Sequence, residues 1–266
     1  MDHPRTSLLG LPREIRDQIL SYLLVNNEDA PRNPHSAGRR KYRSSGCALL
    51  LNDPALRFTK VWAVNRQLRR ELGEHRAMAD GHAELDIQIN NVLYPTWTRL
   101  PLSLRPGKPF DLDVKLRVLT TEGILPVVRL FSYPNQGFSD LFSMLSHLLR
   151  NGPRFHLPSR VAATTSKREP YRLKTLNVLV SFHDYYTPNT WSEATTEIFR
   201  RLDQFAASGI PWPYVERIRA DVKYHDIKHQ AHAEESREWA VDKPVGFPVE
   251  LHQWKSHCNY FDHTGN

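Results

Sequence analysis

Cysteine is scarce in this chain, which has only Cys47 and Cys258 among its 266 residues. Two thiols supply neither the framework of a disulfide-stapled secreted protein nor a cysteine-based zinc site. A chain of this length also buries enough surface to fold without covalent staples. We therefore expect a protein of a reducing compartment.

Long hydrophobic runs are missing as well. No stretch approaches the roughly 18 uninterrupted apolar residues that mark a membrane span. Charges also interrupt the first twenty residues, where a signal peptide would carry its apolar core. These charges are Arg5, Arg13, Glu14, Arg16 and Asp17. The sequence thus predicts a soluble protein of the cytoplasm or nucleus that has no membrane partner.

Motifs of the common enzyme classes are absent. With only 12 glycines, the chain has neither a G-x-x-x-x-G-K-S/T nor a G-x-G-x-x-G phosphate loop. It also lacks the G-x-S-x-G elbow of hydrolases and the H-E-x-x-H signature of metalloproteases. We therefore predict a protein that is not an enzyme, with no catalytic residues and no cofactor.

Histidine, with 13 copies, is the main candidate for metal chemistry. On a helix, His225, His229 and His232 would share one face, a spacing compatible with a transition-metal site. The polar flanking sequence favours a solvated face instead, so we predict no metal site there. His183 and Asp184 follow a buried-looking strand, but the sequence HDYYTPN is typical of a turn.

Positive charge gathers near the N-terminus. The formal net charge is +7, and residues 1–76 carry 14 Lys/Arg against 8 Asp/Glu, which leaves +1 for the rest. The run Arg39, Arg40, Lys41 and Arg43 lies in a segment, 26–53, that we interpret as a basic loop. Such a run is typical of a solvated loop, although nuclear-import signals and phosphate-binding patches share its composition.

Two amphipathic helices are predicted in the N-terminal third. Over residues 7–24, apolar residues recur four apart behind Pro12, which suits a first helical turn. These apolar residues are Leu11, Ile15, Ile19 and Leu23, and the opposite face carries Arg13, Arg16, Asp17 and Ser21. A second helix is predicted over 55–79, where Val61, Val64, Leu68 and Leu72 recur at helical steps. Because short helices are marginal alone, we expect the two to pack together.

These two helices carry a resemblance to a known family. The strings LPREIRDQILSYL, from Leu11 to Leu23, and VNRQLRREL, from Val64 to Leu72, resemble an F-box in its divergent filamentous-fungal form. The resemblance implies a helical module that docks on the Skp-type adaptor of a cullin-RING ubiquitin ligase. It also implies that the contact is formed by Leu11, Pro12, Ile15, Ile19 and Leu23, with Val64 and Leu68 completing the cluster. The chain departs from the family in its longer polar spacer.

Beyond residue 80 the period changes from helical to alternating. Strands are predicted over 85–89, 112–118, 176–182 and 215–222, with helices over 139–150 and 191–207. The continuous run LNVLVSF suggests a strand that is buried on both faces. Strand, helix and strand in succession indicate parallel pairing. We therefore predict an α/β fold, either an irregular, mainly parallel sheet or a leucine-rich-repeat-like arc.

The chain is thus divided into an F-box-like helical module over 1–79, an α/β region over 80–227 and a polar, His-rich tail over 228–266 that includes one exposed helix. The favoured function is an adaptor that holds an unknown target protein near a ubiquitin-transferring partner and so needs no catalytic residue. The alternative is a nuclear or nucleic-acid-associated protein that uses the basic N-terminal third. Nucleic acid is the less favoured partner because no aromatic stacking residues accompany the basic run.

Overall fold

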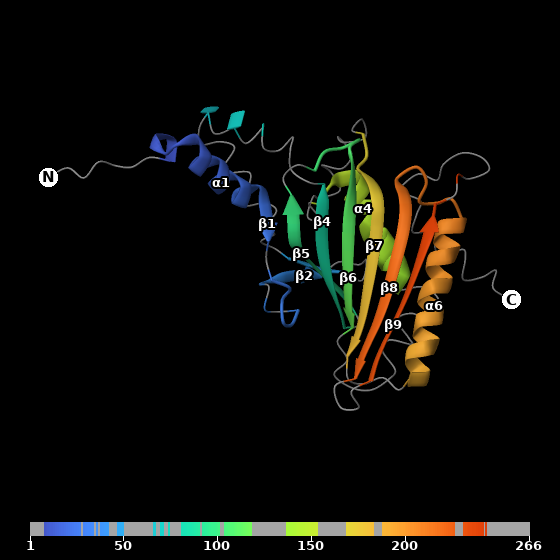
Figure 1. Cartoon of the computed structure of the whole chain (residues 1–266). Helices are drawn as coiled ribbons and strands as arrows, with labels where there is room; N and C mark the ends of the chain where they lie inside the picture. Colours follow the sequence, from blue (N-terminus) through green and yellow to red (C-terminus); the bar gives the residue numbers. More distant parts are fainter. Residues whose placement is uncertain are drawn as a thin grey trace.

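The computed structural model (Figure 1) describes residues 8–27, 29–34, 36, 38–42, 47–50, 66, 67, 70, 71, 74, 81–90, 92–101, 104–118, 137–153, 169–183, 188–226, 231–241 and 243. Within them, a seven-stranded sheet has the order β1-β5-β4-β6-β7-β8-β9. Its strands are β1 (Val25–Asn27), β4 (His82–Asn90), β5 (Val92–Pro101), β6 (Pro109–Val118), β7 (Arg172–His183), β8 (Val215–Asp226) and β9 (Ala231–Ala240).

The four central strands of this sheet run parallel. β4 pairs with β6, β6 with β7 and β7 with β8 in parallel register. The outer strands β5 and β9 pair antiparallel with β4 and β8, and β1 adds antiparallel to β5. The predicted α/β class with a mainly parallel sheet is confirmed. Antiparallel strands at both edges match the irregular sheet rather than the repeat arc, because a solenoid stacks equivalent units throughout.

Two strand–helix–strand units build the parallel part. Helix α4 (Gly137–Asn151) connects β6 to β7, and α6 (Pro188–Ala207) connects β7 to β8, as predicted. Phe142 of α4 and Phe205 of α6 stack with ring centroids 3.9 Å apart, so both helices cover the same face of the sheet. In Figure 1, α4 lies behind the strands. None of the helices in the described residues is long and apolar enough to cross a membrane.

The hydrophobic core lies between the sheet and these two helices. Alternate residues of each central strand are apolar and buried on this side, for example Leu112, Val114 and Leu116 of β6. The other side, which we call the open face, carries mostly polar residues. The prediction that β7 is buried on both faces is wrong, because Asn177 and Leu179 on the open face are only half-buried. Leu179 extends the apolar run, and none of the described helices covers it.

Strands β5 and β9 carry weak sequence signals. Pro95 lies inside β5, where a proline normally argues against a strand, but β5 pairs with β4 along its length. The exposed helix expected in the tail is wrong at 231–240, where the chain forms β9 and extends the sheet. An edge strand packs little apolar surface, so β9 shows no clear alternation. Its Trp239 is half-buried against the core.

The N-terminal third contributes to the sheet as well. A short 3-10 turn (Leu8–Gly10) precedes α1 (Arg13–Leu24), which leads directly into β1. The prediction of a loop over 26–53 is wrong in part, since β2 (Arg40–Tyr42) and β3 (Ala48–Leu50) form an antiparallel pair. β3 lies against β5, and its residues are buried. This segment therefore packs on the α/β region rather than forming a separate basic loop.

Gly152 ends α4 in a conformation that favours glycine. Its φ is +78°, and its N–H donates to the carbonyl of Leu148 at 2.7 Å. A Cβ at this position would lie 2.9 Å from the ring of Tyr171. We therefore expect Gly152→Ala to lower the free energy of unfolding by about 1–2 kcal/mol, as measured by urea denaturation. An unchanged urea midpoint would contradict this account of the helix end.

Candidate functional site

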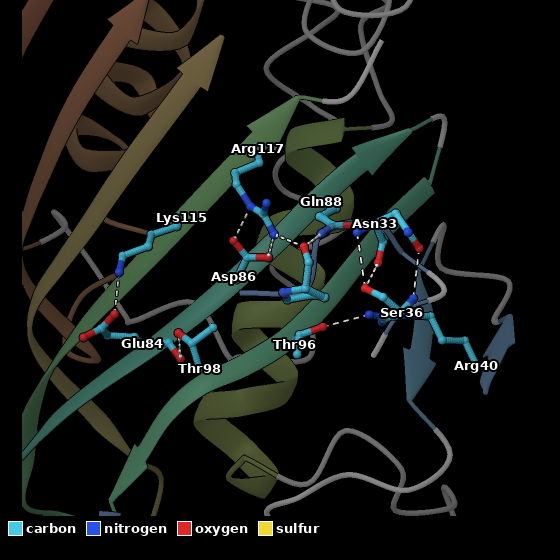
Figure 2. A network of polar contacts seen from close by, with 11 residues as sticks. Asn33, Ser36, Arg40, Glu84, Asp86, Gln88, Thr96, Thr98, Lys115 and Arg117 are labelled. Atoms are coloured by element: carbon cyan, nitrogen blue, oxygen red, sulfur yellow. Dashed lines mark hydrogen bonds and ion pairs between the residues drawn. The ribbon is translucent and has the colours of Figure 1, made fainter. Parts of the chain in front are cut away.

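The open face of the sheet carries a polar network where β4, β5 and β6 lie side by side (Figure 2). Its centre is Asp86, which is fully buried although it lies on this polar face. Arg117 on the neighbouring strand donates to both of its carboxylate oxygens, from Nε at 2.6 Å and from Nη2 at 2.7 Å. This forked geometry fixes the planes of both groups and gives strong, charge-assisted hydrogen bonds.

A stretch of the N-terminal third lies over this ion pair. The carbonyl of Pro31 accepts hydrogen bonds from Gln88 and, at 2.6 Å, from Nη2 of Arg117. Gln88 is fully buried, and Pro31 is buried as well. The backbone of one segment is thus held by side chains of two parallel strands. Because the carbonyl needs these donors once it leaves water, the network fixes the N-terminal segment on the sheet.

Arg40 fixes the same segment further along. Its guanidinium donates to the carbonyls of Pro34, Ala48 and Pro95 at 2.7, 3.0 and 3.0 Å and to the hydroxyl of Thr96 at 2.7 Å. It also lies 5.5 Å from the ring centroid of Tyr94. Figure 2 shows Arg40 on the β5 side of the network. These contacts join β3, β5 and the N-terminal segment through one side chain.

Glu84 extends the network toward the amino-terminal end of β4. It pairs with Lys115 of β6, and its carboxylate lies 3.6 Å from His82. Burial alone would raise the pKa of Glu84, but the hydrogen bond from Lys115 and the nearby positive charges outweigh it and lower the pKa. Glu84 is therefore a charged, paired carboxylate at neutral pH rather than a proton donor.

Toward β8 and β9 no helix or strand of the described residues covers the open face, which carries exposed ion pairs there. Lys223 pairs with Glu234 at 2.9 Å, and Arg217 pairs with Glu238 at 3.3 Å, each across the two strands. The side chains of Arg217 and Glu238 are more than half exposed. Such exposed pairs add little stability. They give this part of the sheet a mixed-charge surface.

The second candidate surface is α1, whose buried side was not anticipated. Arg16, which we expected on the polar face of this helix, is buried and forms a forked ion pair with Glu71 at 2.8 and 3.1 Å. Glu71 is 2% exposed, and it also accepts from Gln67 at 2.9 Å. Leu20, one turn after Arg16, is fully buried. The packed side of α1 is therefore defined by Arg16 and Leu20.

The predicted second helix is described at only a few positions. Residues 66, 67, 70, 71 and 74 are helical, and Glu74 pairs with Arg13 of α1 at 2.5 Å. Val64 and Leu68, expected to complete the hydrophobic cluster, lie outside the described residues. The described part thus connects this segment to α1 through two ion pairs, and the apolar packing of the two helices stays a prediction.

Glu71 makes the stability of this contact dependent on pH. Hydrogen bonds from Arg16 and Gln67 lower the pKa of Glu71 from 4.5 to about 2. A lowered pKa means that the carboxylate stabilises the folded state above pH 4.5 and loses this contribution as the pH falls toward 2. We expect Glu71→Gln to lower the thermal midpoint at neutral pH and to flatten its fall in acid. Glu74→Gln changes a half-exposed ion pair and should leave the thermal midpoint at neutral pH and its fall in acid nearly unchanged. Equal plots of thermal midpoint against pH for wild type and Glu71→Gln would contradict the role assigned to Glu71.

The apolar stripe of α1 lies about 100°, one residue step, around the helix from this packed side. We call Leu11, Ile15 and Ile19 the α1 stripe. Among the described residues, Ile15 is the one large hydrophobic side chain that is exposed, at 42%. Leu11 and Ile19 are half-buried, and Pro12 is exposed just before the helix. Leu23 belongs to α1, but its side chain lies outside the described ones.

The predicted basic patch is not one surface. Arg39 and Lys41 are exposed, whereas Arg40 between them is half-buried and held by the four hydrogen bonds above. Arg43 lies outside the described residues. The interpretation of Arg40 as part of a solvated patch is therefore wrong: strand alternation turns every second residue of β2 toward the sheet.

The histidines lie on strands rather than on one helix. His225 belongs to β8 and His232 to β9, opposite each other in the register, and His183 ends β7. His229 and Asp184 lie outside the described residues. Among the described side chains, no group of three or more His, Cys, Asp or Glu residues is placed to hold a metal ion. The shared helical face considered for His225, His229 and His232 does not form at the two described positions, because His225 and His232 lie on neighbouring antiparallel strands.

The sequence did not single out Asp86, Gln88 or Arg117 as important. The available signal was a set of charged residues at alternate positions of β4 and β6, which is typical of a solvated strand face. Their burial depends on the N-terminal segment crossing the sheet, and no local pattern indicates that contact. Comparison with known proteins gives no further guide: no family model, curated protein or solved structure matches the chain.

Proposed function

We propose that this protein is an F-box-like adaptor that links a target protein to a Skp-type cullin-RING ubiquitin ligase. The observation that supports the proposal is the exposure of Ile15 in the middle of the α1 stripe. Ile15 is 42% exposed in the helix whose sequence resembles an F-box, while Arg16 and Leu20 of the same helix are buried. An apolar residue that is exposed beside the packed side of its own helix suits contact with a second protein.

The alternative role for α1 is an internal cap of the α/β region. A helix in that role buries its main apolar stripe against its own chain. Here the inward side is instead formed by the Arg16–Glu71 ion pair and Leu20, about one residue step around the helix from the stripe. This arrangement supports an external partner for the α1 stripe, and the family resemblance supplies the Skp-type adaptor as that partner.

The open face of β8 and β9 is the surface we assign to the target. It carries both signs of charge on rigid strands, with Arg217, Lys223, Glu234 and Glu238 at least two-fifths exposed. Complementary charges contribute mainly to the selection and orientation of a partner. Binding both proteins raises the local concentration of target near the ligase, which is a mechanism that needs no catalytic group.

Nucleic-acid binding through the basic N-terminal third receives less support. Arg40, in the middle of the basic run, donates hydrogen bonds to Pro34, Ala48, Pro95 and Thr96. Its guanidinium is therefore not free to bind phosphate. In the part of the run that the structure describes, this leaves Arg39 and Lys41 as the exposed cations.

Co-elution tests the proposal. Purified full-length protein and a purified fungal Skp-type adaptor are mixed and separated by size-exclusion chromatography, with multi-angle light scattering to give the mass. We expect a complex with one copy of each protein, because the α1 stripe offers one site per chain. Two separate peaks at micromolar concentrations of both proteins would count against an adaptor role.

A further inference from the structure

Strand β9 lies next to β8 at one end of the sheet, and no other described strand pairs with it (Figure 1). Beyond the last paired residue, the N–H of Val241 donates to the carbonyl of Glu216 at 3.2 Å. Hydrogen-bonded pairs alternate between antiparallel strands, so the odd-numbered residues of β9 direct their backbone groups toward β8. The even-numbered residues, among them Glu234, Ser236 and Glu238, direct theirs outward, where they can pair with another strand.

The charges along β9 select one way in which two copies of this strand can pair. Antiparallel copies are related by a two-fold axis, which passes beside one residue and brings it opposite itself. An axis at Glu235 or at Arg237 places like charges opposite each other, which is destabilising. An axis at Ser236 instead places Glu235 of each copy opposite Arg237 of the other. Ser236 lies beside the midpoint of the ten-residue strand, so this register also pairs almost all of it.

Side chains on the helix side of β9 complement each other in this register. Arg237 lies on that side, 4.5 Å from the ring centroid of Phe199 in α6. Both Glu235 and Arg237 are exposed, so α6 leaves them accessible. They would meet at non-hydrogen-bonded positions, where opposite side chains are closest. Ala233 and Trp239, which both pack against the core, would form the adjacent pair of a small and a large apolar residue.

The side chains on the open face are compatible with the same pairing. Glu234 of one copy would lie opposite Glu238 of the other, but each glutamate already has a cation on β8. Lys223 is 2.9 Å from Glu234, and Arg217 is 3.3 Å from Glu238. These two positions are also the hydrogen-bonded ones, where opposite residues are more widely spaced. The like charges are therefore both neutralised and held apart.

From this self-complementary edge we propose that two copies of the chain associate through β9, with the two-fold axis at Ser236, and form one continuous sheet. Edge pairing of two such strands covers less than the about 1,200 Å² of a stable interface, so the dimer has a Kd of about 10–100 μM. The chain is therefore mostly monomeric at low micromolar concentration. The association goes beyond the adaptor role and does not depend on it, because it uses neither the α1 stripe nor the side chains of β8.

Sedimentation equilibrium of the full-length protein from about 5 to about 500 μM tests the dimer. Glu235→Arg and Arg237→Glu each place two like-charged pairs across the axis, and each should weaken the dimer at least about tenfold. Combining the two replacements restores opposite charges and should return the Kd to within about threefold of wild type. Glu14→Arg, at an exposed position of α1, is the matched control and should dimerise like wild type.

Disulfide crosslinking tests the register. Both variants carry Cys258→Ser, so that the other native thiol is the buried Cys47. In Ser236→Cys the two thiols face each other at a hydrogen-bonded pair, where Cα atoms are about 5.5 Å apart and a disulfide can form. Ala240→Cys is exposed on the same face of β9, but its two copies would lie about 27 Å apart. We expect mild oxidation to crosslink the first variant and not the second.

Thermal midpoints establish that every variant is folded. The proposal is overturned if the wild type is monomeric at about 500 μM. It is also overturned if the single charge reversals dimerise like wild type, if the double reversal does not recover, or if Glu14→Arg loses as much affinity as they do. Crosslinking of Ala240→Cys as fast as that of Ser236→Cys would overturn the proposed register.

Discussion

Replacing Arg117 with methionine should lower the free energy of unfolding by about 3 kcal/mol. Arg117 donates to both oxygens of Asp86, and Asp86 has no exposed surface. Removing the cation leaves a carboxylate buried without its partner, which typically costs about 3–5 kcal/mol. Arg117 itself is about one quarter exposed, so we expect the lower end of this range. The carbonyl of Pro31 also loses a donor in this variant.

Urea denaturation measures this effect, and two further variants identify its cause. Arg219→Met removes an arginine from the same face of the sheet, but Arg219 is half exposed and its bond to Asp221 is 3.3 Å long. We expect it to cost less than about 1 kcal/mol. The double replacement of Asp86→Leu with Arg117→Met should recover much of the loss, because no buried charge remains. A loss below about 1 kcal/mol for Arg117→Met would contradict the role of this ion pair.

Aspartate at both Ile15 and Ile19 should abolish adaptor binding while the chain remains folded. The two residues lie one turn apart on the α1 stripe, so two carboxylates would enter an apolar interface without partners. We expect the affinity for the Skp-type adaptor to fall by at least about 100-fold, which corresponds to about 2.7 kcal/mol. Ile15 is 42% exposed, so its replacement costs the free chain little burial.

The matched control keeps both positions apolar. Ile15→Val combined with Ile19→Val retains the shape of the stripe and should bind within about threefold of wild type. Circular dichroism and the thermal midpoint establish that both double variants are folded. Adaptor binding that survives in the folded aspartate variant would show that the α1 stripe is not the contact surface.

Much of the α/β region follows from local patterns. In β6, alternation of Leu112, Val114 and Leu116 with charged residues predicts a strand with one buried face, and the structure has that strand. Helices α4 and α6 follow from helical spacing of apolar residues, and Gly209, which follows α6, adopts φ +69° as a helix stop commonly does. These features depend on residues within one turn or one strand.

The network on the open face depends on long-range contacts instead. Asp86 and Arg117 are 31 residues apart, and the carbonyl of Pro31 is 86 residues from Arg117. Arg16 was placed on a solvated face because charge alone predicts exposure, whereas its partner Glu71 lies 55 residues away. The sequence pattern did not predict edge strand β9, because an exposed strand needs no apolar alternation. Each of these features depends on the fold bringing distant segments together.

The α1 stripe could be located from the sequence, but the exposure of Ile15 within it could not. Periodicity identifies Leu11, Ile15 and Ile19 as one apolar stripe, which serves equally well to bury a helix or to bind a partner. The choice depends on which side of α1 the rest of the chain covers. In the structure the covered side is that of Arg16 and Leu20.

Titration of a Skp-type adaptor into the full-length wild-type protein by isothermal calorimetry tests the central claim most directly. Measurements at about 50 and about 500 mM NaCl and at two temperatures separate an apolar interface from an electrostatic one. We predict binding with one adaptor per chain, a negative heat-capacity change and an affinity that changes less than about threefold with salt. Absence of binding, or an affinity that falls more than about tenfold at the higher salt, would contradict docking through the α1 stripe.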